Sequence, residues 1–141
     1  MKIILVSIGR ADELAYKALI QDYTSRISHY VDVSWLVSDK EEIILKQIKK
    51  EDYVILLDER GTKLSSTDLA TKLESIQNQS YKKLFFIIGG AFGATKELID
   101  RADYTLSFSQ CVFPHMLMRI LLTEQIYRAF TIIKGEKYHH E

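Results

Sequence analysis

The fold is decided by a short apolar run that ends in glycines, Leu84-Phe85-Phe86-Ile87-Ile88-Gly89-Gly90-Ala91-Phe92-Gly93. Five consecutive apolar residues without alternation are typical of a strand buried on both faces, as in parallel sheets. The glycines let the chain turn sharply and allow a ligand to approach backbone N–H groups. Since an amphipathic segment follows over residues 95–102, this unit is predicted to be a strand, a turn and a helix.

The same alternation of strand and helix continues on both sides of this unit. Strands are predicted at residues 3–8, 31–37, 53–58, 84–88 and 104–108. Helices are predicted at residues 11–28, 41–50, from Ser65 onward, 95–102, and from about Pro114 to Ile133. This pattern predicts an α/β fold, with a mostly parallel sheet and helices on both faces.

Ser65 with Asp68 predicts a capped helix start, and four further local signals mark where elements begin and end. Asp39 with Glu42 resembles an N-cap with its reciprocal partner, and the third strand is expected to stop at residues 59–61. Pro114 suits the first position of the closing helix, and Gly135 suits its end.

Length and composition predict one domain over residues 1–141, with ordinary globular usage of 47% hydrophobic and 27% charged residues. Nineteen basic residues balance nineteen acidic ones. A general nucleic-acid binder would be basic, because phosphate neutralisation supplies most of its affinity. Any nucleic acid is therefore expected to meet a local patch or to arrive within a larger particle.

The single cysteine, Cys111, excludes a disulfide within the chain, and no metal site is predicted. The opening apolar run is too short for a signal peptide. The longest stretch without a polar side chain, residues 84–94, is too short to span a bilayer. We therefore expect a soluble, cytoplasmic protein without membrane contact.

Ligands of parallel sheets bind at the carboxyl ends of the strands, which here means the loops after Leu57, Ile88 and Phe108. The glycine-rich loop matches neither the Walker pattern nor the dinucleotide-binding spacing. It favours a ligand pocket of unspecified chemistry, with a tight turn that binds nothing as the alternative. The segment after Phe108 offers backbone polar groups beside apolar side chains, which would suit an adenine ring. In it, Cys111 is expected to be a small buried apolar residue, with a catalytic thiol as the alternative. His115 is expected to be packed and hydrogen-bonded, with a role as a site residue as the alternative.

The closing helix is apolar on more than one face, which fits either a homodimer contact or a buried central helix. On it, Glu124 and Arg128 stand four residues apart, so they form either an ion pair or part of an anion site. The tail over residues 136–141 is expected from composition to be solvated, although its aromatic and histidine residues could also hold a base.

Several runs in the second half together resemble the RlmH family, bacterial large-subunit rRNA pseudouridine N3-methyltransferases of the SPOUT superfamily. The runs that carry the resemblance are Phe86-Ile87-Ile88-Gly89-Gly90-Ala91-Phe92-Gly93, Leu106-Ser107-Phe108-Ser109, Phe113-Pro114-His115, Glu124-Gln125-Ile126-Tyr127-Arg128-Ala129 and Gly135-Glu136-Lys137-Tyr138-His139. The resemblance implies a C-terminal trefoil knot, a homodimer formed largely by the knotted region, and S-adenosylmethionine bound in the knot. Carried over position by position, the cofactor residues are Leu57, Gly89, Phe108, Ser109, Gln110, Cys111, Val112 and Phe113.

The resemblance also implies methylation of N3 of a pseudouridine in 23S rRNA, on the assembled ribosome. Arg128, Tyr138 and His139 are the catalytic candidates, with the tail near the methyl donor and substrate. Tyr138 and His139 would hold the base, and His139 or bound water would assist deprotonation. Arg128 would stabilise a phosphate or the developing imide anion, and Glu124 is an alternative base. Two other functions stay open: a SPOUT methyltransferase acting on another RNA, and a non-catalytic homologue that binds RNA or the ribosome.

Two departures from the family pattern stand out. Cys111-Val112 replaces the usual Met-Thr, so a hydroxyl is missing, although cofactor contacts through the backbone would survive. The segment between Val37 and Tyr53 is shorter than usual, and we expect this shortening to affect substrate contacts without touching the cofactor loops.

Overall fold

The computed structural model describes residues 1–9 and 14–140. The predicted start of the first helix at Ala11 lies outside the described residues. The elements are, in chain order, β1 (Lys2–Ile8), α1 (Leu14–Ser28), β2 (Asp32–Ser38), α2 (Glu41–Gln47), β3 (Tyr53–Lys63), α3 (Ser66–Asn78), β4 (Lys83–Ile88), α4 (Lys96–Arg101), β5 (Tyr104–Ser107) and α5 (His115–Ile133).

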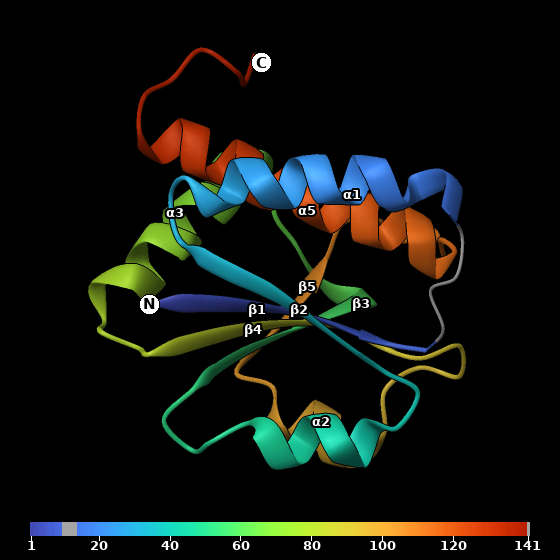
Figure 1. Ribbon diagram of the computed structural model, residues 1–141. Coiled ribbons are helices and arrows are strands. Elements are labelled where there is room, and N and C mark those ends of the chain that lie inside the picture. The colour runs from blue at the N-terminus through green and yellow to red at the C-terminus, as the bar shows by residue number, and fades with distance from the viewer. Residues whose placement is uncertain (10–13, 141) are drawn as a thin grey trace.

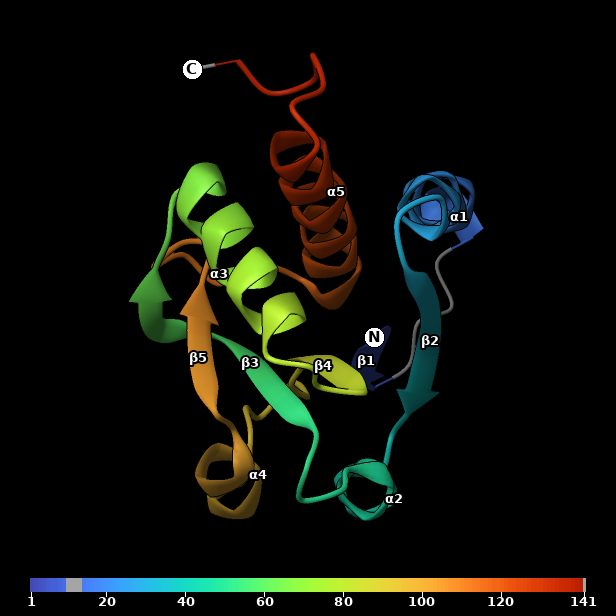
Figure 2. The same ribbon diagram turned by 90° about the vertical axis from the view of Figure 1, so that its left-hand side faces the viewer.

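The five strands form one sheet in the order β2-β1-β4-β3-β5, and every pairing in it is parallel. Helices α1, α3 and α5 cover one face, while α2 and α4 cover the other (Figures 1 and 2). This arrangement confirms the predicted α/β class. Because β4, β3 and β5 are neighbours with the same direction, the loops that follow them leave the sheet at one edge.

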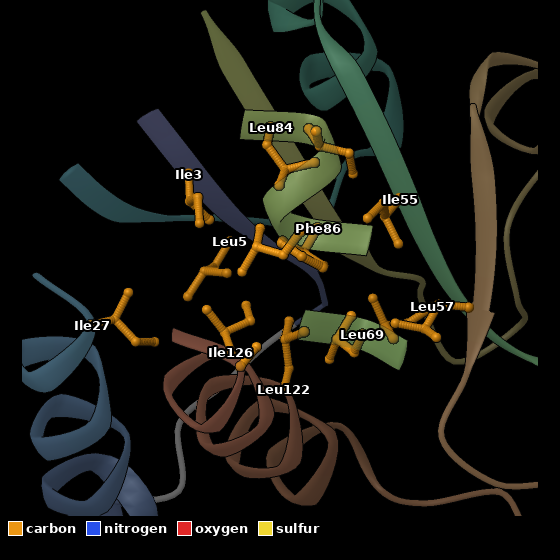
Figure 3. Packing of buried hydrophobic residues seen from close by; sticks show 14 of the residues in the cluster. Ile3, Leu5, Ile27, Ile55, Leu57, Leu69, Leu84, Phe86, Leu122 and Ile126 are labelled. Atoms are coloured by element: carbon orange, nitrogen blue, oxygen red, sulfur yellow. The ribbon is translucent and has the colours of Figure 1, made fainter. Parts of the chain in front are cut away.

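The core lies on both faces of the sheet. Ile3 and Leu5 of β1 contribute to the cluster shared with α1, α3 and α5, whereas Val6 and Ile8 belong to the cluster on the opposite face. Figure 3 shows the larger cluster, in which Leu122 and Ile126 of α5 pack toward the sheet. Successive side chains of a strand point to opposite faces of the sheet. Strands with an uninterrupted apolar sequence therefore supply core residues to both faces.

Strand β3 is longer than expected. The predicted stop at residues 59–61 is wrong, because the strand continues to Lys63 after a register shift between Leu57 and Thr62 against β5. Such an irregularity lets a strand bend and resume pairing. A Cβ at Gly61 would lie 2.7 Å from the carbonyl oxygen of Thr105, so glycine permits this close approach.

Helix ends follow the predicted signals in part. Asp39 does not cap α2: the N-cap is Lys40, without a side-chain bond, and the helix ends earlier than predicted, at Gln47. Pro114 lies at the N-cap of α5 and not at its first helical position. Gly135, at φ +68°, ends α5 as predicted.

The cap of α3 is formed as predicted, because the Ser65 hydroxyl accepts a hydrogen bond from the backbone N–H of Asp68. Within the described part of the chain, no helix is long and apolar enough to cross a membrane.

Candidate active site

A pocket of about 180 Å³ opens at the carboxyl edge of the sheet. Three loops line it: the end of β3, the loop of residues 89–95 (the glycine loop), and the segment after β5. The first turns of α5 close it through His115 and Met118. The structure therefore brings together the three loops that the strand pattern singled out.

Nearly all the proposed cofactor residues border this pocket. They are Leu57, Gly89, Phe108, Ser109, Cys111, Val112 and Phe113. Gln110 is not among the lining residues. The expectation that Cys111 is buried is wrong: its backbone N–H bonds to the Ser109 hydroxyl at 3.0 Å in a tight turn, and the residue is exposed.

Asp58 and Arg60 line the pocket but were not predicted as site residues. The Arg60 guanidinium donates to both carboxylate oxygens of Asp58, at 3.1 and 3.0 Å, and its backbone N–H donates to Asp58 Oδ1 at 2.8 Å. These hydrogen bonds from Arg60 lower the pKa of Asp58, so the pair stays charged at the pocket mouth. The sequence did carry a signal for these two residues: they follow a predicted buried strand directly, in the segment after Leu57 that was already predicted to bind a ligand.

The glycine loop is anchored from outside the pocket. Within it, the Gly93 N–H bonds to the Gly90 carbonyl oxygen at 2.9 Å, and Gly93 has φ +81°. At its end, the Thr95 hydroxyl accepts from the Leu98 N–H at 3.3 Å and caps α4. The carboxylate of Glu41, on α2, accepts hydrogen bonds from the Thr95 N–H at 3.3 Å and from the Thr95 hydroxyl. The segment between β2 and β3 thus contacts the end of the glycine loop at Thr95, a residue that does not line the pocket.

His115 differs from its expected role. It lines the pocket, but its Nδ1 atom is buried and has no hydrogen-bond partner among the described residues. Burial, followed by the nearby Arg119 charge, lowers the pKa of His115. The imidazole is therefore neutral at physiological pH.

The catalytic candidates meet in a second place, which we name the tail cluster: Glu124, Arg128, Tyr138 and His139. The Arg128 guanidinium donates to Glu124 Oε1 at 2.9 and 2.5 Å and approaches His139 Nδ1 at 3.1 Å. The Tyr138 hydroxyl donates to Glu124 Oε1 at 3.1 Å. The structure thus holds the tail against the last turns of α5.

Aromatic packing adds to this attachment. The Arg128 guanidinium lies 4.7 Å from the centre of the Tyr138 ring, whose edge-on contact with Tyr127 has a centroid distance of 4.7 Å. Burial, together with hydrogen bonds and the Glu124 charge, raises the pKa of Tyr138, so its hydroxyl stays protonated. The composition-based expectation of a solvated tail is wrong for Tyr138 and His139, although Lys137 and His140 are exposed.

Within one chain, the structure does not bring the pocket and the tail cluster together. His115 borders the pocket and Arg128 lies thirteen residues further along α5, which corresponds to about 20 Å of helix. The tail leaves the far end of α5, away from the carboxyl edge of the sheet (Figures 1 and 2). Among the residues that the structure describes, no group of acidic, histidine or cysteine side chains could hold a metal ion.

A parallel α/β sheet with a ligand pocket at its carboxyl edge is a class shared by many enzymes, and comparison with known proteins narrows it. The family model described as "Predicted SPOUT methyltransferase" matches residues 1–139. The ribosomal RNA large subunit methyltransferase H of Christiangramia forsetii is 37% identical over 156 residues, and that of Alkaliphilus oremlandii 40% over 158 residues. Both alignments cover 99% of this chain and 99% of the relative. The chain therefore belongs to the SPOUT methyltransferases and, among them, to the ribosomal RNA large subunit methyltransferase H family.

Solved structures support the same fold. A probable methylase family protein from Haemophilus influenzae matches with a TM-score of 0.52 at 14% identity. The SpoU methyltransferase AviRb from Streptomyces viridochromogenes, solved in complex with AdoMet, matches with a TM-score of 0.52 at 9% identity. The matches cover 95% and 96% of this chain, but only 66% and 61% of those chains. At these identities the likeness concerns the fold alone.

Proposed function

We propose that the protein methylates N3 of a pseudouridine in 23S rRNA, using S-adenosylmethionine, on the assembled ribosome in the cytoplasm. One observation carries the proposal: all but one of the residues that the family resemblance assigns to the cofactor line a pocket at the carboxyl edge of the sheet. Membership in a family whose members are named as ribosomal RNA methyltransferases supports the substrate class.

The pocket has features that suit S-adenosylmethionine. Gly90 and Gly93 expose backbone beside Phe108, and the buried Nδ1 atom of His115 offers a polar contact. Leu57, Gly89 and the segment of residues 108–113 would hold the cofactor. When bound, S-adenosylmethionine supplies an electrophilic methyl group on a sulfonium sulfur.

In the overall reaction, the carbon–sulfur bond to this methyl group breaks and a carbon–nitrogen bond to N3 forms. The imide proton of N3 leaves, and the products are N3-methylpseudouridine, S-adenosylhomocysteine and a proton. In-line alignment of nitrogen, carbon and sulfur is the main requirement, so residues that position the base should supply much of the rate.

The tail cluster is suited to hold a base and to stabilise negative charge. Arginine can only donate hydrogen bonds, so its contact makes His139 Nδ1 an acceptor and leaves the hydrogen on Nε2. Tyr138 is protonated, and the bond to Glu124 raises the pKa of Arg128, which stays cationic. These groups would bind the base and the developing imide anion, while the N3 proton passes to bound water. Glu124 accepts bonds from Arg128, Tyr138 and Gln125, which favours its ion-pair role over that of a base.

The proposal needs two copies of the chain. The pocket and the tail cluster lie at opposite ends of α5, so a complete site requires the pocket of one copy and the tail of another. This geometry supports the expected homodimer, whereas the C-terminal trefoil knot stays an expectation from the family resemblance.

The direct test is transfer of a radiolabelled methyl group from S-adenosylmethionine to ribosomes that lack the pseudouridine methyl group. Free large subunits and naked rRNA are measured alongside. Label at N3 of one pseudouridine, on assembled particles, is the expected result. Label on another RNA would favour a different substrate, and cofactor binding without any transfer would favour a non-catalytic role.

Mixing two inactive variants tests the composite site. Gly89→Leu is designed to fill the pocket, and Tyr138→Ala removes the tail's aromatic ring. In a mixed dimer, the intact pocket of one chain faces the intact tail of the other, so activity should return after subunit exchange. If the mixture stays inactive although mixed dimers form, each chain completes its own site and the two-copy arrangement is wrong.

A further inference from the structure

His115 combines two features that do not fit a structural role. Its Nδ1 atom is buried without a hydrogen-bond partner among the described residues, and the side chain borders the pocket. Buried polar atoms in native proteins are nearly always paired, because an unmade bond costs the full desolvation of the group. An exception at the edge of a pocket therefore points to a partner that arrives with the ligand.

The surroundings set the position of this ring. His115 is the first residue of α5, directly after Pro114 at the N-cap. Opposite it, a Cβ at Gly9 would lie 3.5 Å from His115 Cε1 and 3.7 Å from Nδ1. The edge of the ring that carries Nδ1 therefore faces the end of β1, while the His115 side chain also lines the pocket.

The charge state of the ring suits a neutral hydrogen-bonding group. Burial and the Arg119 guanidinium, which bonds to the Ser7 hydroxyl at 3.0 Å, both disfavour a second positive charge beside it. A neutral imidazole donates from one nitrogen and accepts at the other. It can therefore make one specific bond at Nδ1 without repelling a cationic sulfonium nearby.

We propose that His115 is a cofactor-binding residue, whose Nδ1 atom forms a hydrogen bond with a polar group of the S-adenosylmethionine bound in the pocket. The assignment rests on the proposed function, in which this pocket takes that cofactor. The loop residues assigned through the family resemblance would thus be joined by a side chain of α5 in contacting the cofactor.

Binding measurements with S-adenosylmethionine and S-adenosylhomocysteine, by titration calorimetry, test the assignment. His115→Phe keeps a ring but loses Nδ1, so both ligands should bind roughly three- to tenfold more weakly. His115→Asn places an amide group near the position of Nδ1 and should recover most of the affinity. His29→Asn, at an exposed histidine after α1, is the matched control and should bind like the unaltered protein. Equal affinity of His115→Phe and the unaltered protein would overturn the proposal.

Two further measurements separate a binding role from a structural one. His115→Phe removes an unpaired polar atom, so the ligand-free variant should melt at the same temperature as the unaltered protein or higher. A structural histidine would instead give a lower melting temperature. In addition, the ¹⁵N resonance of His115 Nδ1 should shift when S-adenosylhomocysteine is added, and an unmoved resonance at saturation would refute the contact.

A comparison with 5′-methylthioadenosine identifies the half of the cofactor involved. This compound lacks the amino-acid end, so a persistent effect of His115→Phe assigns the bond to the nucleoside, and a lost effect assigns it to the amino acid. If the unaltered protein binds none of these compounds, the proposed function and the His115 assignment both fail. If it binds them but His115→Phe does so equally well, only the His115 assignment fails.

Discussion

Replacing Arg128 with lysine should separate the attachment of the tail from the stability of the fold. Lysine keeps a positive charge but lacks the planar group that donates twice to Glu124, faces His139 Nδ1 and covers the Tyr138 ring. We expect the tail to lose its fixed position while α5 stays folded.

The expected loss of stability is modest. The Arg128–Glu124 pair retains side-chain exposures of 24% and 17%, so its bonds are partly screened by solvent. Arg128→Lys removes charge-assisted hydrogen bonds and a cation–π contact, but lysine can still form an ion pair with Glu124. The free energy of unfolding should therefore fall by about 1–2 kcal/mol. For a domain of this size the melting temperature should fall by about 3–7 °C. Methyl transfer should fall much further, by about 10²–10³, if Arg128 stabilises developing charge.

The assay combines thermal melting with single-turnover methyl transfer at a temperature where both proteins are folded. Arg26→Lys is the matched control, because Arg26 also pairs with an acidic residue four positions away, Asp22, and lies over the Tyr127 ring. It should retain near-normal transfer. If Arg128→Lys is no less active than this control at equal folded fraction, then the tail cluster does not act in the reaction.

Three further outcomes follow from the structure. Glu41→Gln weakens the bonds that hold Thr95 at the end of the glycine loop, so the KM for S-adenosylmethionine should rise several-fold with kcat little changed; an equal fall in kcat would instead indicate a general structural defect. Gly61→Ala forces a Cβ to within 2.7 Å of the Thr105 carbonyl oxygen and should cost about 1–3 kcal/mol in chemical denaturation, whereas an unchanged midpoint would show that β3 shifts freely. The pKa of His115 is lower in the folded protein than its ordinary 6.5, so the unfolded chain binds the extra proton first and stability should fall as pH drops below about 6.5. That fall has a slope of at most about 1.4 kcal/mol per pH unit for one group, and His115→Asn should flatten it; an identical pH profile in the variant would contradict this origin.

Much of the fold was predictable because it depends on local pattern. The uninterrupted apolar run of residues 84–88 predicted a strand buried on both faces. Ser65 with Asp68 predicted a helix start, and this cap forms as expected. Prediction failed where distant segments decide the outcome. Whether β3 continues past its predicted end depends on pairing with β5, and the predicted cap at Asp39 does not form, since Lys40 is the N-cap of α2.

The candidate site shows the same division. Strand ends and glycines indicated which loops would line a pocket. Asp58 and Arg60 were missed because, in the sequence, charged residues after a strand are typical of an ordinary solvent-exposed turn. The unpaired Nδ1 atom of His115 was missed for a different reason. Whether a buried atom has a hydrogen-bond partner depends on the residues packed around it, and these are known only from the folded structure.

By itself, the sequence determined the class of fold, the order of its elements, the loops at the carboxyl edge and the family, because each depends on periodicity or on residues that are adjacent in the chain. The tertiary structure decided that Glu41 anchors the glycine loop, that the tail packs on Arg128, and that the pocket and the tail cluster stand at opposite ends of α5. The physical reason is that hydrogen bonds, burial and separation in space arise between residues far apart in the chain, and only the folded arrangement brings those residues together or keeps them apart.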